Sequence, residues 1–269
     1  NFSLKKIKEM PALHKGMGKI LEGILKYQKT IQSELLPLFR EILDKPAPKM
    51  AIVTGTDSRI VASRLLQAQP GTFFLIRSPG NFIPKYESLD TSVASGTPAA
   101  LELACVNNNA NTIVVLGHSD SKPLNMLFDM KDNLEEHESN NPSALKKWLI
   151  LNGKDSVVKY KEFEKSGFNK CLTFSEGEPN QFDAYIDPDN QFSPQDKFTM
   201  INTLKQLKNV NNYNFLRDRI TKKLLRGYAL WTDITTNDVY MFSYKAKRFV
   251  KIDESTYNDL YKECDTINQ

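Results

Sequence analysis

The stretch MAIVTGTDSR (residues 50–59) decides the fold, because a continuous apolar run passes directly into a turn that carries charged side chains. Two later stretches repeat this arrangement: TFFLIRSPGN (72–81) and TIVVLGHSDS (112–121). Short continuous apolar runs are typical of strands that are buried on both faces. Helical patterns separate the three runs, and this alternation predicts an α/β fold with a central, mostly parallel sheet and helices on both faces.

Further elements are predicted outside these three runs and between them. Apolar residues recur at helical spacing from 17 to 43, which predicts a long amphipathic N-terminal helix with a kink at Pro37. Pro98 is expected to open another helix, with Thr97 as its cap. Near the C-terminus, two strands flank the turn TTND and predict an antiparallel hairpin at the edge of the sheet.

The domain organisation follows from the absence of a clear linker. No Pro-, Gly- or Ser-rich stretch after residue 17 divides the 269 residues. We therefore expect an N-terminal arm over residues 1–16 and a single domain over 17–269.

Composition excludes two classes of partner. The 36 Lys and Arg residues exceed the 32 Asp and Glu residues by only 4, without a dense basic block, so a nucleic-acid-binding role is not expected. No apolar run approaches the roughly 18 residues of a membrane span.

The three cysteines are few and widely spaced, which favours a reducing compartment. The basic first stretch, which begins with Asn1, is compatible with a trimmed organelle presequence.

Candidate functional residues follow the three apolar runs. In an open parallel sheet, ligands bind beyond the carboxyl ends of the strands. The three turns contribute Asp57 and Arg59, then Arg77 and Asn81, and finally His118. We expect these side chains to meet at one edge of the sheet.

These motifs resemble those of the β-class carbonic anhydrases, most closely the animal-type branch. That family carries Cys-x-Asp-Ser-Arg, Arg-Asn-x-Gly-Asn and Gly-His-Ser-x-Cys after successive strands, and this chain reads GTDSR (55–59), RSPGN (77–81) and GHSDS (117–121). The resemblance covers roughly residues 17–254. It implies the family fold, and it implies a dimer in which the N-terminal helix crosses onto a partner subunit.

The resemblance also identifies a missing metal site. The family holds zinc with two cysteine thiolates and one histidine, and the matching positions here are Gly55, Ser121 and His118. Glycine has no ligand atom, and a serine hydroxyl is not deprotonated near neutral pH. Cys105 lies within an apolar helix, where it is expected to be a buried hydrophobe rather than a substitute ligand. We therefore expect no zinc and no other cofactor at these vestigial positions.

Asp57 and Arg59 match a dyad that governs access to the metal in the family. Without the metal we interpret them as a relic that persists as a buried ion pair, whose disruption from one side would cost about 3–5 kcal/mol. Pro79 and Pro123 depart from the usual family residues near the pocket and stiffen its loops. Asn237 replaces a usual glycine in the closing turn, which tolerates it because asparagine accepts a positive φ.

Three hypotheses for function remain. The leading one is a catalytically inactive carbonic-anhydrase-like subunit, working as a homodimer, as a heterodimer with a related chain, or inside a larger assembly. The first alternative is a zinc-dependent carbonate dehydratase with unconventional ligands from His118, Asp57 and Ser121. The second is a bicarbonate- or anion-binding module that uses Arg59, Arg77 and Asn81.

Overall fold

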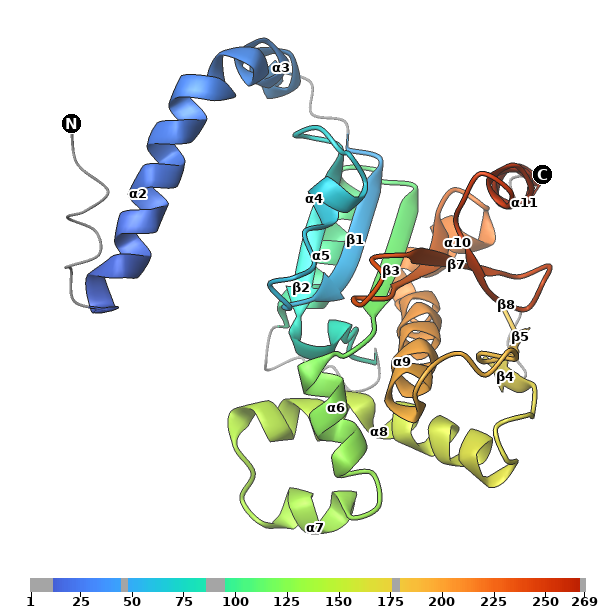
Figure 1. The fold of residues 1–269 in the computed structure, drawn as a ribbon. Coiled ribbons are helices and arrows are strands. Elements are labelled where there is room, and N and C mark those ends of the chain that lie inside the picture. Colours follow the sequence, from blue (N-terminus) through green and yellow to red (C-terminus); the bar gives the residue numbers. More distant parts are fainter. Residues whose placement is uncertain (1–11, 45–47, 86–94, 176–179, 267–269) are drawn as a thin grey trace. The chain divides into compact units, whose positions relative to one another are not determined.

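The computed structural model describes residues 12–44, 48–85, 95–175 and 180–266 (Figure 1). The chain divides into two units, residues 1–47 and 48–269, each described here by itself. Residues 1–11 of the predicted arm lie outside the described residues. The assignment of a single domain to residues 17–269 stays a prediction.

The described residues of the first unit form two helices, α2 (Ala12–Thr30) and α3 (Gln32–Asp44). The predicted helix is therefore present, but it begins at Ala12 and its break falls at Ile31. Pro37 lies inside α3, where the lack of one backbone N–H removes a single helical hydrogen bond without ending the helix. The kink predicted at Pro37 was thus placed six residues too late.

The second unit is built on a six-stranded sheet with the order β2-β1-β3-β6-β7-β8. The first four strands of this order are parallel: β2 (Phe73–Ser78), β1 (Met50–Gly55), β3 (Thr112–His118) and β6 (Arg226–Thr232). Two antiparallel strands follow, β7 (Val239–Ser243) and β8 (Arg248–Lys251). The predicted parallel sheet and C-terminal hairpin are confirmed, and β8 is an additional strand.

Alternating residues of the central strands supply two apolar cores, as expected for strands buried on both faces. Val53 and Val115 belong to the larger core, together with residues of α5 (Gly96–Glu102), α8 (Ala144–Lys165) and α9 (Pro194–Asn211). Ile52 and Val114 face the other side, where α4 (Ala62–Leu65) packs against them. The helices predicted on both faces are present, although α4 is short.

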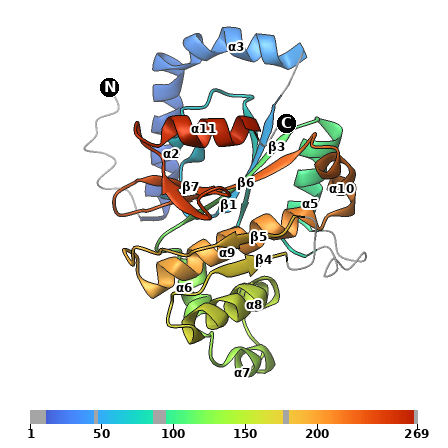
Figure 2. The ribbon, with the colours of Figure 1, turned by 90° about the vertical axis from the view of Figure 1, so that its right-hand side faces the viewer.

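The larger core lies beneath α9 (Pro194–Asn211), which packs on β3 and β6 and separates the sheet from α8 (Ala144–Lys165) (Figure 2). Glycine at position 117 allows this close approach: a Cβ there would lie 1.9 Å from Oγ1 of Thr203 on α9. On β6, Nε1 of the buried Trp231 donates to Oγ1 of Thr199, 2.8 Å away. These contacts fix α9 beside the carboxyl ends of β3 and β6.

The remaining elements complete the second unit. Helix α5 (Gly96–Glu102) begins before the predicted Pro98, with Ser95 at its cap, and passes into a π-helical turn, η3 (Leu103–Asn107). A small two-stranded sheet, which the sequence did not indicate, pairs β4 (Leu172–Phe174) with β5 (Phe182–Ala184). The other elements are η1 (Pro79–Asn81), α6 (Lys122–Asp129), α7 (Leu134–Ser139), α10 (Asn214–Thr221) and α11 (Tyr257–Thr266). Among the helices that the structure describes, none has the length and apolar character to span a membrane.

Candidate functional site at the strand exits

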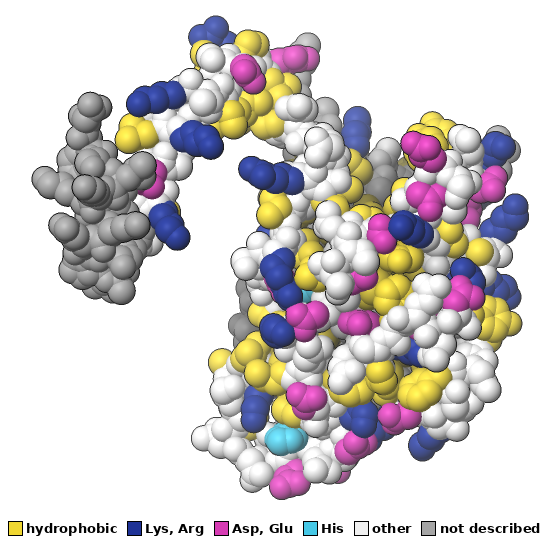
Figure 3. Space-filling model, in the orientation of Figure 1, with side chains coloured by type: hydrophobic (Ala, Val, Ile, Leu, Met, Phe, Trp, Pro, Cys, Tyr) yellow, Lys and Arg dark blue, Asp and Glu magenta, His cyan; other side chains and the backbone are white. Residues whose placement is uncertain are grey.

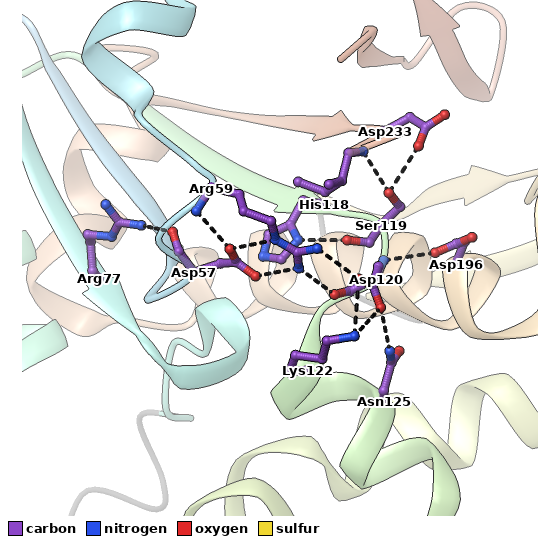
Figure 4. A network of polar contacts seen from close by, with 11 residues as sticks. Asp57, Arg59, Arg77, His118, Ser119, Asp120, Lys122, Asn125, Asp196 and Asp233 are labelled. Carbon is purple, nitrogen blue, oxygen red and sulfur yellow. Dashed lines mark hydrogen bonds and ion pairs between the residues drawn. The ribbon is translucent and has the colours of Figure 1, made fainter. Parts of the chain in front are cut away.

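The candidate site lies where β1 and β3 end side by side at the carboxyl edge of the sheet (Figure 4). His118 is the last residue of β3 and is 3 % exposed. Its Nδ1 lies 2.8 Å from the carbonyl oxygen of Ser119, which only accepts, so Nδ1 carries the proton in this contact. Burial lowers the pKa of His118 and favours the neutral ring. The lone pair of Nε2 therefore remains available.

Gly55, the last residue of β1, faces this nitrogen. A Cβ at position 55 would lie 3.1 Å from Nε2 of His118, so a side chain here would begin against the imidazole. The Gly55 carbonyl accepts a hydrogen bond from Nε of Arg77, 2.9 Å away. The structure thus brings together Gly55 and His118, two of the three vestigial positions, and it shows that position 55 adjoins the imidazole nitrogen.

Asp57 and Arg59 form a bidentate ion pair in the turn after β1. Nε and Nη2 of Arg59 donate to the two carboxylate oxygens of Asp57, at 2.9 and 2.6 Å. The backbone N–H of Arg59 donates to the same carboxylate, and these bonds hold the pKa of Asp57 well below its usual value. The predicted dyad is confirmed as a contact. The expectation that it is buried is wrong, because the Arg59 side chain is 38 % exposed, so water screens the pair.

Asp120 is a member of the site that the sequence analysis did not select. Its carboxylate accepts from Nη1 of Arg59 at 2.8 Å, and its carbonyl accepts from Nη2 at 2.9 Å. Lys122 and Asn125 also donate to this carboxylate, while the backbone N–H of Asp120 donates to Asp196 at the start of α9. Arg59 therefore ties the exit of β1 to the exit of β3. The sequence feature that could have identified Asp120 is its negative charge within GHSDS, which is opposite to the charge of Arg59.

Arg77 lies in β2 and Asn81 in η1, directly after it, and they make different contacts. Arg77 donates through Nη2 to the carbonyl of Asp57, in addition to its bond to Gly55. Asn81 is buried with a φ of 49°, and its Oδ1 accepts from Asn202, while its Nδ2 has no partner. Among the described residues, no hydrogen bond joins Asn81 to either arginine. The anion pocket of Arg59, Arg77 and Asn81 stays a prediction.

Ser121 follows the β3 exit and caps α6. It is buried, and its carbonyl accepts from the backbone N–H of Asn125 at 2.7 Å. Pro123 lies in the first turn of α6, and Pro79 opens η1, where its carbonyl accepts from Trp148 Nε1. The expected positive φ of Asn237 is confirmed at 61°.

Cys105 lies in η3 and is fully buried, as expected for a small hydrophobe. Burial raises the pKa of its thiol to about 11, so sulfur is protonated near neutral pH. Within the ranges that the structure describes, no group of three His, Cys, Asp or Glu side chains is arranged to hold a metal ion.

Comparison with known proteins identifies one family over most of the chain. The sequence model of a family described as carbonic anhydrase matches residues 50–239. Beta carbonic anhydrase 1 of Caenorhabditis elegans is 36 % identical over 251 residues, 92 % of each chain. A carbonic anhydrase of Helicobacter pylori strain J99 is 24 % identical over 87 % of this chain and 93 % of its own.

Solved structures show the same fold. The β-carbonic anhydrase CcaA superposes with a TM-score of 0.70 at 22 % identity, over 89 % of this chain and 93 % of its own. A structure from a study of two tetrameric β-carbonic anhydrases of Sordaria macrospora gives a TM-score of 0.60 at 16 % identity, over 85 % and 97 % of the two chains. Given the family match and the nematode relative, the chain belongs to the β-carbonic anhydrase family.

Proposed function

We propose that this chain is a pseudoenzyme of its family, a catalytically inactive subunit with a structural or interaction role. The observation that carries the proposal is the position of Gly55. The place from which a thiolate would reach towards Nε2 of His118 belongs to a residue without a side chain. The scaffold around that place keeps the family fold and the Asp57–Arg59 pair.

The donors at this edge do not fit the zinc that the family resemblance implies. Zinc sites in proteins use sulfur, imidazole nitrogen and carboxylate oxygen in tetrahedral geometry. Here His118 offers one imidazole nitrogen, Ser121 offers a neutral hydroxyl, and both carboxylate oxygens of Asp57 accept from Arg59. A structural zinc site contributes about 10–16 kcal/mol of binding free energy, and loss of two thiolates removes most of it.

Without the metal, the remaining groups cannot make the nucleophile that CO₂ hydration requires. Bulk water has a pKa of about 15.7, and a bound zinc ion lowers it to about 7. Nε2 of His118 can only accept a proton from ordinary water, which is weak general-base catalysis. We therefore expect no hydration activity above that of an imidazole side chain in solution.

The direct test is CO₂ hydration by the purified chain, followed by ¹⁸O exchange. The matched comparison is the double variant Gly55→Cys with Ser121→Cys, beside Ser121→Cys alone. Gly55 has no positive φ, so a side chain is sterically allowed once His118 yields a few tenths of an ångström. The proposal expects background exchange from the wild type and zinc binding only by the double variant. Exchange well above background by the wild type would overturn it.

A second candidate function is a zinc-dependent carbonate dehydratase with ligands from His118, Asp57 and Ser121. Two observations favour it: the relatives carry the name carbonic anhydrase, and the lone pair of Nε2 is free. This function needs Asp57 to leave Arg59. It predicts a metal ion about 2.0–2.3 Å from Nε2 in crystals grown with zinc, and a water molecule at that position would exclude it.

The proposed role as a subunit is supported by the first unit. Large apolar side chains on α2 and α3 are about half exposed, and Figure 3 shows hydrophobic side chains on the surface of these helices. The exposed fractions on α2 include those of Ile20 (55 %), Leu21 (52 %), Ile24 (48 %) and Leu25 (54 %). Such a face is stabilised when another chain covers it. We propose a homodimer, or a heterodimer with a related chain. Sedimentation equilibrium tests this, since a monomer at micromolar concentration would contradict it.

The compartment is also a proposal, because only the basic first stretch and the family resemblance suggest the mitochondrion. Immunolocalisation of the endogenous protein decides between the mitochondrial location and the cytoplasmic alternative.

A further inference from the structure

A second cavity lies at the opposite edge of the sheet, where β6 begins. It has a volume of about 890 Å³ and is lined by the start of β6, the end of α9, α10 and residues 180–181. Arg226 opens β6 and pairs with Thr112, whereas Thr232 ends it beside His118. The two ends are six residue steps apart along the strand, about 20 Å at 3.3 Å per step. The cavity is therefore separate from the strand-exit site, and its function does not rest on the proposal above.

The charged residues of the described lining are all positive. They are Arg217, Lys223 and Arg226, and none of the described lining residues is acidic. The Arg226 side chain is half-buried, and its Nη1 atom is buried without a hydrogen-bond partner. An unpaired buried donor is destabilising, and an acceptor with a negative charge would supply the partner that this nitrogen lacks.

The lining also offers polar and apolar surface beside these cations. Asn211 and Asn212 bring amide groups at the end of α9. Leu207 lies against Gly227, where a Cβ would be 2.6 Å from its Cδ1, so the glycine makes room for this apolar wall. Tyr244 also lines the cavity, and burial raises the pKa of its phenol, which keeps it uncharged beside an anion.

We propose that this cavity binds an amphiphilic organic anion, whose carboxylate or phosphate group pairs with Arg226 and whose apolar part lies against Leu207 and Tyr244. Its volume falls in the range of about 300–1,000 Å³ that small-molecule sites occupy. Its lining combines polar and charged side chains with the apolar side chains of Leu207, Ile220 and Leu225, which suits a ligand that is part polar and part apolar. Arg217, on the adjoining helix, adds a second positive charge at the same cavity.

The test is isothermal titration calorimetry of the whole chain with octanoate, octyl phosphate and 1-octanol as probes. Octanol has the apolar body without the charge, and the two anions distinguish a carboxylate from a phosphate site. Arg226→Gln removes the charge, Arg226→Lys keeps it, and Arg64→Gln on α4 is the matched control outside the cavity lining. Circular dichroism melting confirms that each variant is folded.

We expect saturable binding of at least one anion, with octanol at least about 10-fold weaker. Arg226→Gln should weaken the anion about 10- to 100-fold, the usual effect of a lost charge-assisted hydrogen bond. Arg226→Lys should restore part of the binding, and Arg64→Gln should leave it unchanged. Arg217→Gln, on the exposed side, should weaken binding about 3- to 10-fold even if Arg226→Gln does not fold.

Three outcomes would overturn the proposal. The first is a dissociation constant above about 1 mM for both anions, which is a binding free energy weaker than about −4.1 kcal/mol. The second is octanol binding as tight as that of the anions, which would show a purely apolar site. The third is unchanged anion binding by folded Arg226→Gln or, where that variant fails to fold, by Arg217→Gln, which would place the anion elsewhere.

Discussion

Two glycines lie next to His118, one before it on the same strand and one on the neighbouring strand, and their surroundings differ. Gly117 precedes the histidine on β3, and a Cβ there would lie 1.9 Å from Thr203 of α9. Gly55 lies on the neighbouring strand, and a Cβ there would meet only the imidazole closely, at 3.1 Å from Nε2. Helix packing requires the first glycine, whereas nothing in the packing requires the second.

The glycine that the fold requires and the glycine at the candidate site therefore lie on different sides of His118. On the packed side of β3, α9 lies close against the sheet, at Gly117 and through the hydrogen bond between Trp231 and Thr199. The strand-exit side keeps the Asp57–Arg59 pair, extended by Asp120, but presents Gly55 towards the imidazole. Substitutions on the two sides should therefore differ in their effect on stability, and four of them test that contrast.

Gly117→Ala should have the largest effect. The added methyl group would overlap Thr203 in a close-packed interface, and overpacking of this kind costs about 3 kcal/mol or more. Urea unfolding measures the change in the free energy of unfolding. Gly117→Ala combined with Thr203→Ala should recover part of it, because the second change removes the clashing oxygen. An unchanged midpoint for the single variant would show that α9 does not lie as close as described.

Arg59→Gln should have an intermediate effect. It removes the hydrogen bonds that join Asp57 to Asp120, but the guanidinium is 38 % exposed, so we expect a loss of only about 1–2 kcal/mol. Arg64→Gln is the matched control, since it removes an arginine from the short helix that follows. A loss of 3–5 kcal/mol would restore the expectation of a buried pair.

The same pair predicts a pH dependence. Because Arg59 lowers the pKa of Asp57 in the folded state, the pair stabilises the fold above the ordinary carboxyl pKa of about 3.9. This contribution should be lost as the pH falls below that value. The difference in unfolding free energy between wild type and Asp57→Asn should therefore be larger at pH 6 than at pH 3. An equal difference at both values would mean that the pair contributes nothing.

Gly55→Ala should have the smallest effect, within about 0.5 kcal/mol. The gain from a less flexible unfolded chain offsets the small shift that His118 must make. Differential scanning calorimetry beside Gly117→Ala gives the direct contrast between the two positions. A loss above about 2 kcal/mol would show that the fold itself requires a glycine at position 55.

The sequence predicted the parallel sheet well, because its strands are continuous apolar runs. It failed at element ends: α5 begins at Gly96 rather than Pro98, since backbone bonds and not the Thr97 side chain start the helix. The β4–β5 sheet was missed because three-residue strands carry too little pattern to detect.

For the candidate site, the motifs predicted that Asp57, Arg59 and His118 lie at one edge of the sheet, but not what surrounds them there. The exposure of Arg59 depends on how the turns after β1 and β3 approach each other, which no local pattern records. Asp120 was overlooked for the same reason, since it meets Arg59 across 61 positions in the chain. The cavity at Arg226 combines residues from α9, α10 and β6, and no single motif contains them.

The central claim is that the strand exits of this chain do not bind zinc. The most direct measurement is the zinc content of untagged wild-type protein, purified without chelators from cells grown with added zinc, by inductively coupled plasma mass spectrometry. We expect far less than one zinc ion per chain, and close to one for the double variant Gly55→Cys with Ser121→Cys. About one zinc ion per wild-type chain, lost when His118 is changed to alanine, would contradict it.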